Sequence, residues 1–115
     1  MINYQGNYNM FGLLDRDIKY INKALEQHSE IEKAIIFGSR AMGNYKKGSD
    51  VDIAIIGKDV NRGIIYQIDD CLNEVYPLPY FFDVILYNEI TNENLINHIN
   101  NEGKVIYTKS KYSQI

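Results

Sequence analysis

The sequence predicts a mixed α/β (α+β) domain in which helices pack against a small mixed β-sheet. Three observations lead to this class. Short runs of β-branched residues end at glycines, stretches with an apolar residue every three or four positions alternate with them, and the chain has only 115 residues. A chain of this length can bury roughly two-thirds of its unfolded surface. We therefore expect a single domain over residues 1–115 that needs neither disulfides nor a structural metal.

A helix and then a strand are expected first. The helix is predicted from Phe11 onward, because apolar residues recur at the spacing of one helix face: Leu14, Ile18, Ile21 and Leu25. The run 34–37 is short, rich in β-branched residues and closed by Gly38, which predicts a buried strand. Residues 39–49 are polar and contain two further glycines, so they are expected to connect this strand to the next.

The rest of the chain continues the alternation. Pro77 and Pro79 lack an amide hydrogen and end any helix before them, and Gly103 is suited to end the last helix. The polar stretches 1–9 and 108–115 are expected to be flexible. The predicted elements are a strand over 51–56, a helix over 61–76, a strand over 80–87, a helix capped by Asn88 or Thr91 and ending near Asn101, and a short strand over 105–107.

Composition excludes several classes of protein. The net charge is −3, so there is no overall attraction to nucleic acid or to anionic membranes, and nucleic-acid binding is not expected. Cys71 is the single cysteine, which excludes an intramolecular disulfide. The first residues have neither the basic start nor the apolar centre of a signal peptide, and no apolar run approaches the ~20 residues that span a bilayer. We expect a soluble, cytoplasmic protein.

Three acidic residues stand in otherwise apolar strands. Asp50 and Asp52 flank Val51 at the start of one run. Asp83 lies within the next run, which is expected to be a buried strand and has no lysine or arginine nearby in sequence to pair with it. Carboxylates two apart share a face of a strand, where they repel each other next to an apolar core unless a cation binds. Mg²⁺ favours such ligands, and two metal ions can support in-line displacement at phosphorus. The alternative is a strand that begins at Val51, with Asp50 capping the preceding loop and Asp52 at the solvent edge.

A glycine-serine turn follows the first strand. Gly38 allows positive φ and close approach of a ligand, and Ser39 can donate its hydroxyl and act as a helix N-cap. The amides of such a turn suit a phosphate, and Arg40 could pair with phosphate oxygens. Lys46 and Lys47 lie in the same connection, but a pair of lysines in a loop is most often solvated surface.

Together these residues resemble a known signature. Gly38-Ser39, ten residues and then Asp50-Val51-Asp52 are similar to the motif of the DNA polymerase β-type nucleotidyltransferase superfamily. The motifs Gly-Ser-Arg-Ala and Ser-Asp-x-Asp, together with the C-terminal stretch 99–107, are most similar to those of the minimal nucleotidyltransferase (MNT) group. The resemblance covers about residues 12–107.

The resemblance implies the polymerase β-like fold and a reaction. Gly38, Ser39 and Arg40 would bind the phosphates of ATP. Asp50, Asp52 and Asp83 would be the catalytic acids and hold Mg²⁺, in a two-metal site, while an acceptor hydroxyl attacks the α-phosphorus. Asp83 matches the third acid by its place on the next strand, without a diagnostic motif around it.

The resemblance also implies a partner. MNT proteins are antitoxins of two-gene systems whose toxin is a HEPN-domain ribonuclease, and their activity includes transfer of AMP to a tyrosine of that toxin. A chain of 115 residues leaves little room to enclose an acceptor, which agrees with an acceptor supplied by another protein. Two alternatives stay open: a binding module that neutralises the partner by complex formation alone, and transfer to a small molecule of the aminoglycoside type.

Neither of the two histidines is expected at the acidic site. His28 and His98 lie in or beside predicted helices and are far from the acids in sequence. We expect both to be surface or cap residues rather than ligands.

Overall fold

Four strands form one mixed sheet in the computed structural model, which describes residues 10–109. The strand order is β3-β2-β1-β4. β1 pairs antiparallel with β2 and with β4, whereas β2 and β3 run parallel. The strands are β1 (Lys33–Phe37), β2 (Val51–Ile56), β3 (Phe82–Leu86) and β4 (Lys104–Thr108). The predicted fold class is confirmed. The expected flexibility of residues 1–9 and 110–115 concerns segments outside the described residues.

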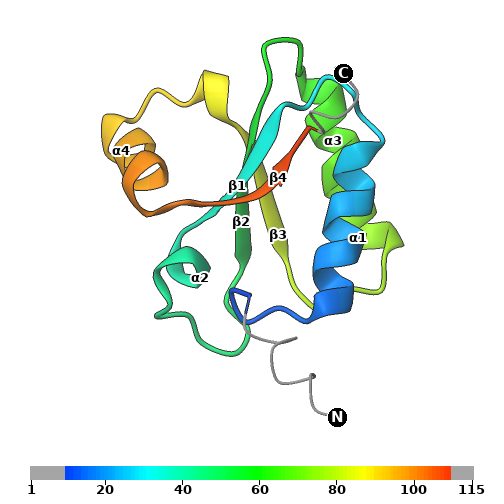
Figure 1. Cartoon of the computed structure of the whole chain (residues 1–115), viewed down its shortest axis with the longest axis vertical. Coiled ribbons are helices and arrows are strands. Elements are labelled where there is room, and N and C mark those ends of the chain that lie inside the picture. Colours follow the sequence, from blue (N-terminus) through cyan, green and yellow to red (C-terminus); the bar gives the residue numbers. More distant parts are fainter. Residues whose placement is uncertain (1–9, 110–115) are drawn as a thin grey trace.

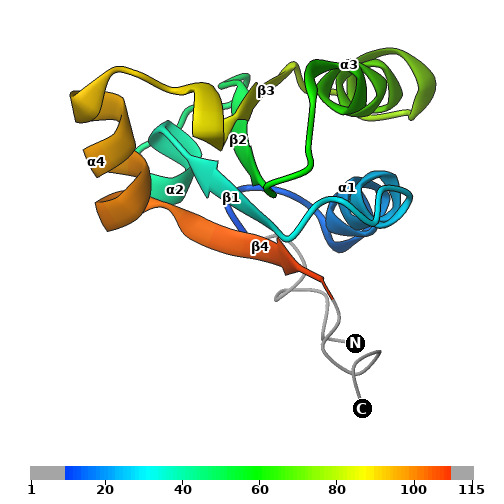
Figure 2. The same ribbon diagram turned by 90° about the horizontal axis from the view of Figure 1, so that it is seen from above.

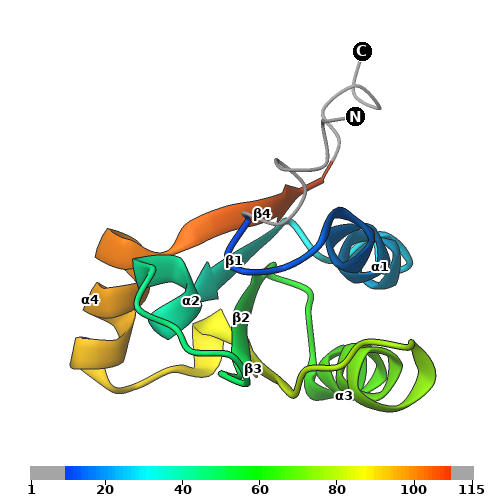
Figure 3. The same ribbon diagram turned by 90° about the horizontal axis from the view of Figure 1, so that it is seen from below.

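Helices cover both faces of the sheet. α1 and α3 lie side by side on one face, and α4 lies on the other, as Figures 2 and 3 show along two opposite directions. The short α2 follows β1 directly. In Figure 1 it lies below α4, at the lower end of the sheet. The helices are α1 (Asp15–Glu26), α2 (Ser39–Met42), α3 (Arg62–Asp70) continued by the π-helical turn η2 (Cys71–Val75), the 3₁₀ turn η3 (Tyr87–Glu89) and α4 (Glu93–Glu102).

The hydrophobic core has two parts of unequal size, because side chains alternate between the two faces of each strand. Val51, Ile53 and Ile55 of β2 point to the face of α1 and α3, where they join a large buried cluster. Ala54 points to the opposite face and joins a small cluster with Phe37 and Ile99 of α4. Asp52 has the parity of Ala54, so the sheet places it on the α4 face.

Several predicted boundaries differ from the structure. α1 begins at Asp15 rather than at Phe11, because residues 10–13 form a turn in which the Leu13 amide donates to the Met10 carbonyl at 2.9 Å. The cap of α4 is neither Asn88 nor Thr91: the Asn92 side chain accepts from the Leu95 amide. The four-residue helix α2 was not predicted. Thr108 and Lys109 were expected to be flexible, yet Thr108 pairs with Lys33 in the sheet.

The outer edge of β3 is partly closed by a side chain of η2. Asn73 accepts a hydrogen bond from the Phe82 amide at 2.8 Å and donates one to the Phe82 carbonyl at 2.9 Å. A carboxamide thereby takes the place of a neighbouring strand for one residue. The structure therefore satisfies the first backbone groups of an edge strand that would otherwise be open to another chain.

None of the helices between residues 10 and 109 combines the length and the apolar character needed to cross a membrane.

Candidate nucleotide-binding and acidic site

Gly38 is the point where the predicted turn and the predicted acids meet. Its φ of 78° and ψ of −157° suit glycine and strain other residues. A Cβ atom built on Gly38 would collide with Oδ2 of Asp52. The backbone of the turn therefore lies directly against the Asp52 carboxylate. Glycine is required here both for its backbone conformation and for this close approach.

Ser39 is the first residue of α2 rather than its cap. The cap is Gly38, whose carbonyl accepts hydrogen bonds from the amides of Ala41 and Met42 at 3.1 and 3.2 Å. The half-buried Ser39 follows at once, so its hydroxyl and amide belong to the same tight turn. The predicted position of Ser39 beside the acids thus agrees with the backbone, while its contact with phosphate stays a prediction.

The acids lie at the N-terminal ends of β2 and β3, which run parallel. Asp52 of β2 is the register partner of Asp83 of β3, so their backbones are one interstrand spacing apart. Asp50 is exposed and immediately precedes β2, which begins at Val51. That boundary is the one stated in the alternative interpretation of the acidic pair. The alternation of the strand nevertheless gives Asp50 and Asp52 the same parity.

Charge crowding at this edge affects Asp52 most. Burial is the main cause that raises the pKa of Asp52 from 3.8 to about 6, and the carboxylates of Asp83 and Asp50 add to the rise. The nearby His98 acts in the opposite direction. Three carboxylates thus share one electrostatic environment, which a divalent cation with a preference for oxygen ligands would relieve.

The residues fit such a cation in kind, although their side chains are not gathered around one point. Between residues 10 and 109, no three side chains among the histidines, cysteines, aspartates and glutamates lie close enough together to hold a metal ion as they stand. The three carboxylates are therefore suitable ligands, and the register of β2 and β3 sets Asp52 beside Asp83. Binding of Mg²⁺ stays a prediction.

Asp83 was expected inside a buried strand, and this expectation was wrong. Asp83 is exposed, because β3 is the edge of the sheet and shows a pattern with buried ends and an open middle. The apolar residues around Asp83 predicted the strand correctly but not its place in the sheet. The absence of a neighbouring cation in sequence is therefore no indication of a buried charge.

His98 belongs to this site, contrary to its interpretation as a surface or cap residue. It is half-buried on α4, and its Nε2 accepts a hydrogen bond from the Gly38 amide at 2.9 Å. Its ring also meets the Phe37 ring edge to face, with centroids 6.2 Å apart. No motif in the sequence marks His98. Its position next to Ile99, the buried residue of α4, is the one signal that could have placed it near the sheet.

Arg40 is buried and, among the described residues, donates all its hydrogen bonds to backbone carbonyls. It is 4% exposed, and Nε and Nη2 donate to the Ser49 carbonyl at 3.1 and 2.9 Å, while Nη1 donates to the Phe11 carbonyl at 2.9 Å. Its guanidinium also lies 5.1 Å from the ring centres of both Tyr45 and Tyr80. The predicted pairing of Arg40 with phosphate oxygens stays a prediction. The structure shows instead an arginine that ties the loop before Asp50 to the start of the domain.

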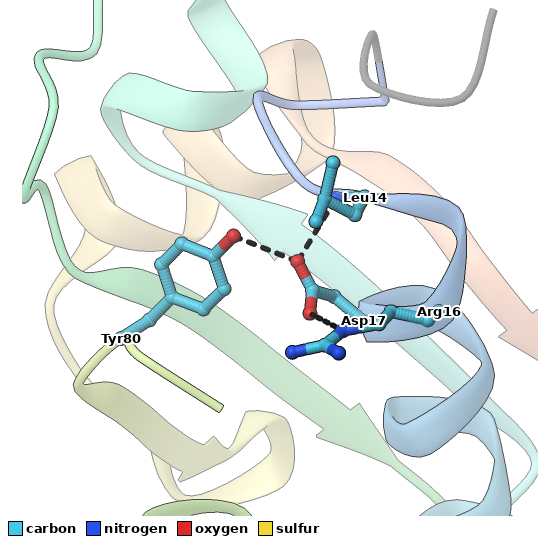
Figure 4. Close-up of polar contacts among 4 residues, drawn as sticks. All are labelled: Leu14, Arg16, Asp17 and Tyr80. Atoms are coloured by element: carbon cyan, nitrogen blue, oxygen red, sulfur yellow. Dashed lines mark hydrogen bonds and ion pairs between the residues drawn. The ribbon is translucent and has the colours of Figure 1, made fainter. Parts of the chain in front are cut away.

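A buried carboxylate extends this connection to α1. Asp17 is fully buried, and its Oδ2 accepts from the Tyr80 hydroxyl at 2.7 Å and from the Leu14 amide at 2.9 Å (Figure 4). Burial, followed by the hydrogen bond to Asp17, raises the pKa of Tyr80 to about 12. Arg40, Tyr80 and Asp17 therefore form one polar chain that joins α2, the segment before β3 and α1.

The two loop lysines are exposed and line a cavity together with Arg40. The cavity has a volume of about 480 Å³ and is also bordered by Tyr45 and Tyr80. The interpretation of Lys46 and Lys47 as solvated surface agrees with their exposure.

Comparison with known proteins identifies the class. Residues 19–112 match the family described as Polymerase beta, Nucleotidyltransferase. The chain belongs to this family and is a nucleotidyltransferase. The resemblance inferred from the Gly-Ser and Asp-x-Asp motifs is confirmed.

Individual relatives agree with the family. Over 100 residues the chain is 33% identical to "Putative protein adenylyltransferase MJ0604" of Methanocaldococcus jannaschii, which covers 81% of this chain and 97% of the relative. A crystal structure of a toxin-antitoxin with AMP-PNP has a TM-score of 0.66 at 19% identity, covering 84% of this chain and 77% of that one. The toxin-antitoxin MntA-HepT has a TM-score of 0.61 at 17% identity, with 87% and 77% covered. Both structures confirm the fold.

Proposed function

We propose that this nucleotidyltransferase is an antitoxin that transfers AMP from ATP to a tyrosine hydroxyl of a partner ribonuclease toxin of the HEPN class, with Mg²⁺ bound by its acids. The observation that carries the proposal is the contact between the Gly38 turn and the Asp52 carboxylate, with Asp83 in register beside it. The name of the 33% identical relative, which mentions protein adenylylation, supports the reaction. The two toxin-antitoxin structures of the same fold support the partner.

Each residue has a defined task in the proposed reaction. The Ser39 amide and hydroxyl, held in place by the Gly38 turn, bind the β- and γ-phosphates, which fixes the α-phosphorus in front of Asp52. Asp50, Asp52 and Asp83 hold Mg²⁺, which when bound neutralises phosphate charge and favours a good leaving group. The tyrosine oxygen forms a bond to the α-phosphorus, and the bond from that phosphorus to the β-phosphate oxygen breaks. The hydroxyl proton passes to Asp83, and pyrophosphate leaves.

The decisive experiment uses the product of the neighbouring gene as acceptor. Purified chain, ATP and Mg²⁺ should raise the mass of that protein by one AMP group, with the modification on a tyrosine. The variant Asp50→Asn/Asp52→Asn should abolish the change. The matched control Asp59→Asn/Asp70→Asn removes the same charge at two exposed positions and should leave the reaction unchanged. Absence of any mass increase with the wild-type chain would contradict the proposed transfer.

A binding-only antitoxin is the second candidate, because the three acids are not gathered around one point in the structure. In that case a folded Asp50→Asn/Asp52→Asn variant would still bind the toxin and protect cells from it. Protection that disappears in the folded variant rejects this candidate. Turnover of ATP with a small-molecule acceptor and no partner protein would indicate the third alternative.

A further inference from the structure

The contact between His98 and Gly38 joins two segments that are 60 residues apart in the chain. Gly38 is held from two sides: the Asp52 carboxylate of β2 lies against its Cα, and His98 of α4 accepts its amide hydrogen. The turn that leads to Ser39 is therefore oriented from outside its own loop. α4 is itself anchored to β1 and β2 by Ile99, which packs with Phe37 and Ala54.

We propose that His98 is a positioning residue that orients the Gly38 amide and, through it, the phosphate-binding turn of this nucleotidyltransferase. The proposal rests on the proposed function, since it assumes that this turn meets the β- and γ-phosphates of ATP. The atom that accepts this hydrogen bond is Nε2, so Nε2 carries no proton and its lone pair fixes the direction of the Gly38 N–H bond.

The hydrogen bond between His98 and Gly38 could either orient the turn or compete with phosphate, and the two roles predict opposite effects of removing it. If His98 orients the turn, then removal of its acceptor atom leaves the peptide between Phe37 and Gly38 free to rotate, and triphosphate binding weakens. If His98 merely occupies an amide that the phosphate needs, then its removal strengthens binding. The sheet anchoring of α4 favours the first, because the imidazole is placed by a helix whose buried residue is its neighbour in sequence.

Two substitutions separate the acceptor atom from the ring. His98→Phe keeps an aromatic ring against Phe37 but has no acceptor. His98→Gln loses the ring but carries a carboxamide oxygen at about the reach of Nε2. His28→Phe, on a half-buried histidine next to the end of α1, is the matched control. Titration calorimetry with Mg-ATP and, separately, with AMP measures the dissociation constants. AMP lacks the phosphates that the turn is proposed to bind, so it reports any general loss of structure.

His98→Phe should weaken ATP binding about tenfold, as expected when one hydrogen bond that orders a turn is lost, and leave AMP binding unchanged. His98→Gln should restore ATP binding to within about twofold of wild type, and His28→Phe should have no effect. Equal ATP affinity in wild type and His98→Phe, or tighter binding in the variant, overturns the proposal. A wild-type chain that binds no ATP overturns the proposed function instead.

A measurement without any ligand tests the contact itself. In a ¹⁵N-labelled chain, a scalar coupling between the Gly38 amide nitrogen and the His98 Nε2 should be detectable across the hydrogen bond. It should be absent in His98→Phe. Absence of the coupling in wild type overturns the assignment of His98, whatever the outcome of the activity assays.

Discussion

At the scale of single residues, the site depends on an unusually close contact between backbone and side chain. Gly38 has positive φ and leaves no space for a Cβ beside Asp52, whereas Gly43 has a φ of 86° and open space around it. The two glycines therefore serve different ends. Gly43 provides the left-handed residue that ends α2, and Gly38 allows a carboxylate to lie against the chain.

The raised pKa of Asp52 predicts how stability responds to pH. The folded protein holds a proton on Asp52 more tightly than the unfolded chain does, since the pKa is about 6 when folded and 3.8 as the ordinary value. Protonation therefore stabilises the fold, and this stabilisation is lost as the pH rises from about 4 through about 6. The variant Asp52→Asn should unfold at a higher temperature than wild type at pH 8 and at a similar temperature near pH 4.

Thermal unfolding without divalent cations, monitored by circular dichroism, measures this difference. Asp59→Asn is the control for a general change in net charge, and its effect should not follow the same pH window. A stability gain of Asp52→Asn that is equally large at both pH values would contradict the raised pKa. Addition of Mg²⁺ at pH 8 should stabilise wild type and not the variant, if Asp52 is a ligand.

At the scale of elements, Arg40 connects the loop over residues 43–50 to the rest of the domain. Three of its nitrogen atoms donate to the carbonyls of Ser49 and Phe11, and its charge lies between two tyrosine rings. Ser49 directly precedes Asp50. The position of the first acid of the Asp-x-Asp motif is therefore determined in part by an arginine at the other end of the same connection.

This arrangement predicts that Arg40 is needed for stability. Arg40→Met should lower the free energy of unfolding by about 2–4 kcal/mol, because two half-buried carbonyls lose their donor and the buried guanidinium loses its place between two tyrosine rings. Arg40→Lys should recover little, since an ammonium group cannot span both carbonyls as the planar guanidinium does. Urea denaturation measures both effects, with Arg62→Lys, an 80% exposed arginine of α3, as control. If Arg40→Lys were as stable as wild type and bound ATP more weakly, the predicted pairing with phosphate would be the better account.

At the scale of the whole molecule, the two faces of the sheet are covered by hydrophobic clusters of unequal size. The face of α1 and α3 carries the large cluster, while the face of α4 carries a cluster whose fully packed residues are Phe37, Ala54 and Ile99. α4 contributes a single buried residue to it. We therefore expect α4 to open before the rest of the domain, since local stability follows the amount of buried apolar contact.

A comparison of Ile99→Ala on α4 with Ile68→Ala on α3 tests whether α4 opens before the rest of the domain. Both changes remove a fully buried side chain and should cost about 2–4 kcal/mol if the whole domain responds. Native-state hydrogen exchange should show that Ile68→Ala accelerates exchange throughout the sheet. Ile99→Ala should act mainly on the amides of α4. Equal acceleration in β1 and α4 in the Ile99 variant would show that the domain opens as one unit.

Much of this architecture could be predicted from the sequence, because local patterns determine it. Neighbours in the chain mark the β-branched run from Val51 to Ile56 and the Gly38-Ser39 turn, so the strand and the turn could be predicted. Asp52 could be placed beside the turn only through the resemblance of the Gly-Ser and Asp-x-Asp motif to the nucleotidyltransferase signature.

The remainder depends on the order of strands and on contacts between distant segments. Nothing near Asp83 says that its strand is the edge of the sheet, so its exposure could not be inferred. Arg40 finds carbonyl acceptors at Phe11 and Ser49, and carbonyls carry no sequence signal. His98 reaches Gly38 only because α4 folds back onto β1. Such partners are properties of the tertiary structure.

The parallel pairing of β2 with β3 limits how this part of the sheet can misfold. The pairing that sets Val51 beside Phe82 in the interior also sets Asp52 beside Asp83 on the opposite face of the sheet. Sliding β3 by one position would turn Phe82 out to solvent and Asp83 into the apolar interior, and folding would fail. The packing of the interior thus rules out a slip of one position, and the same packing that buries Val51 and Phe82 keeps Asp52 and Asp83 on one face of the sheet.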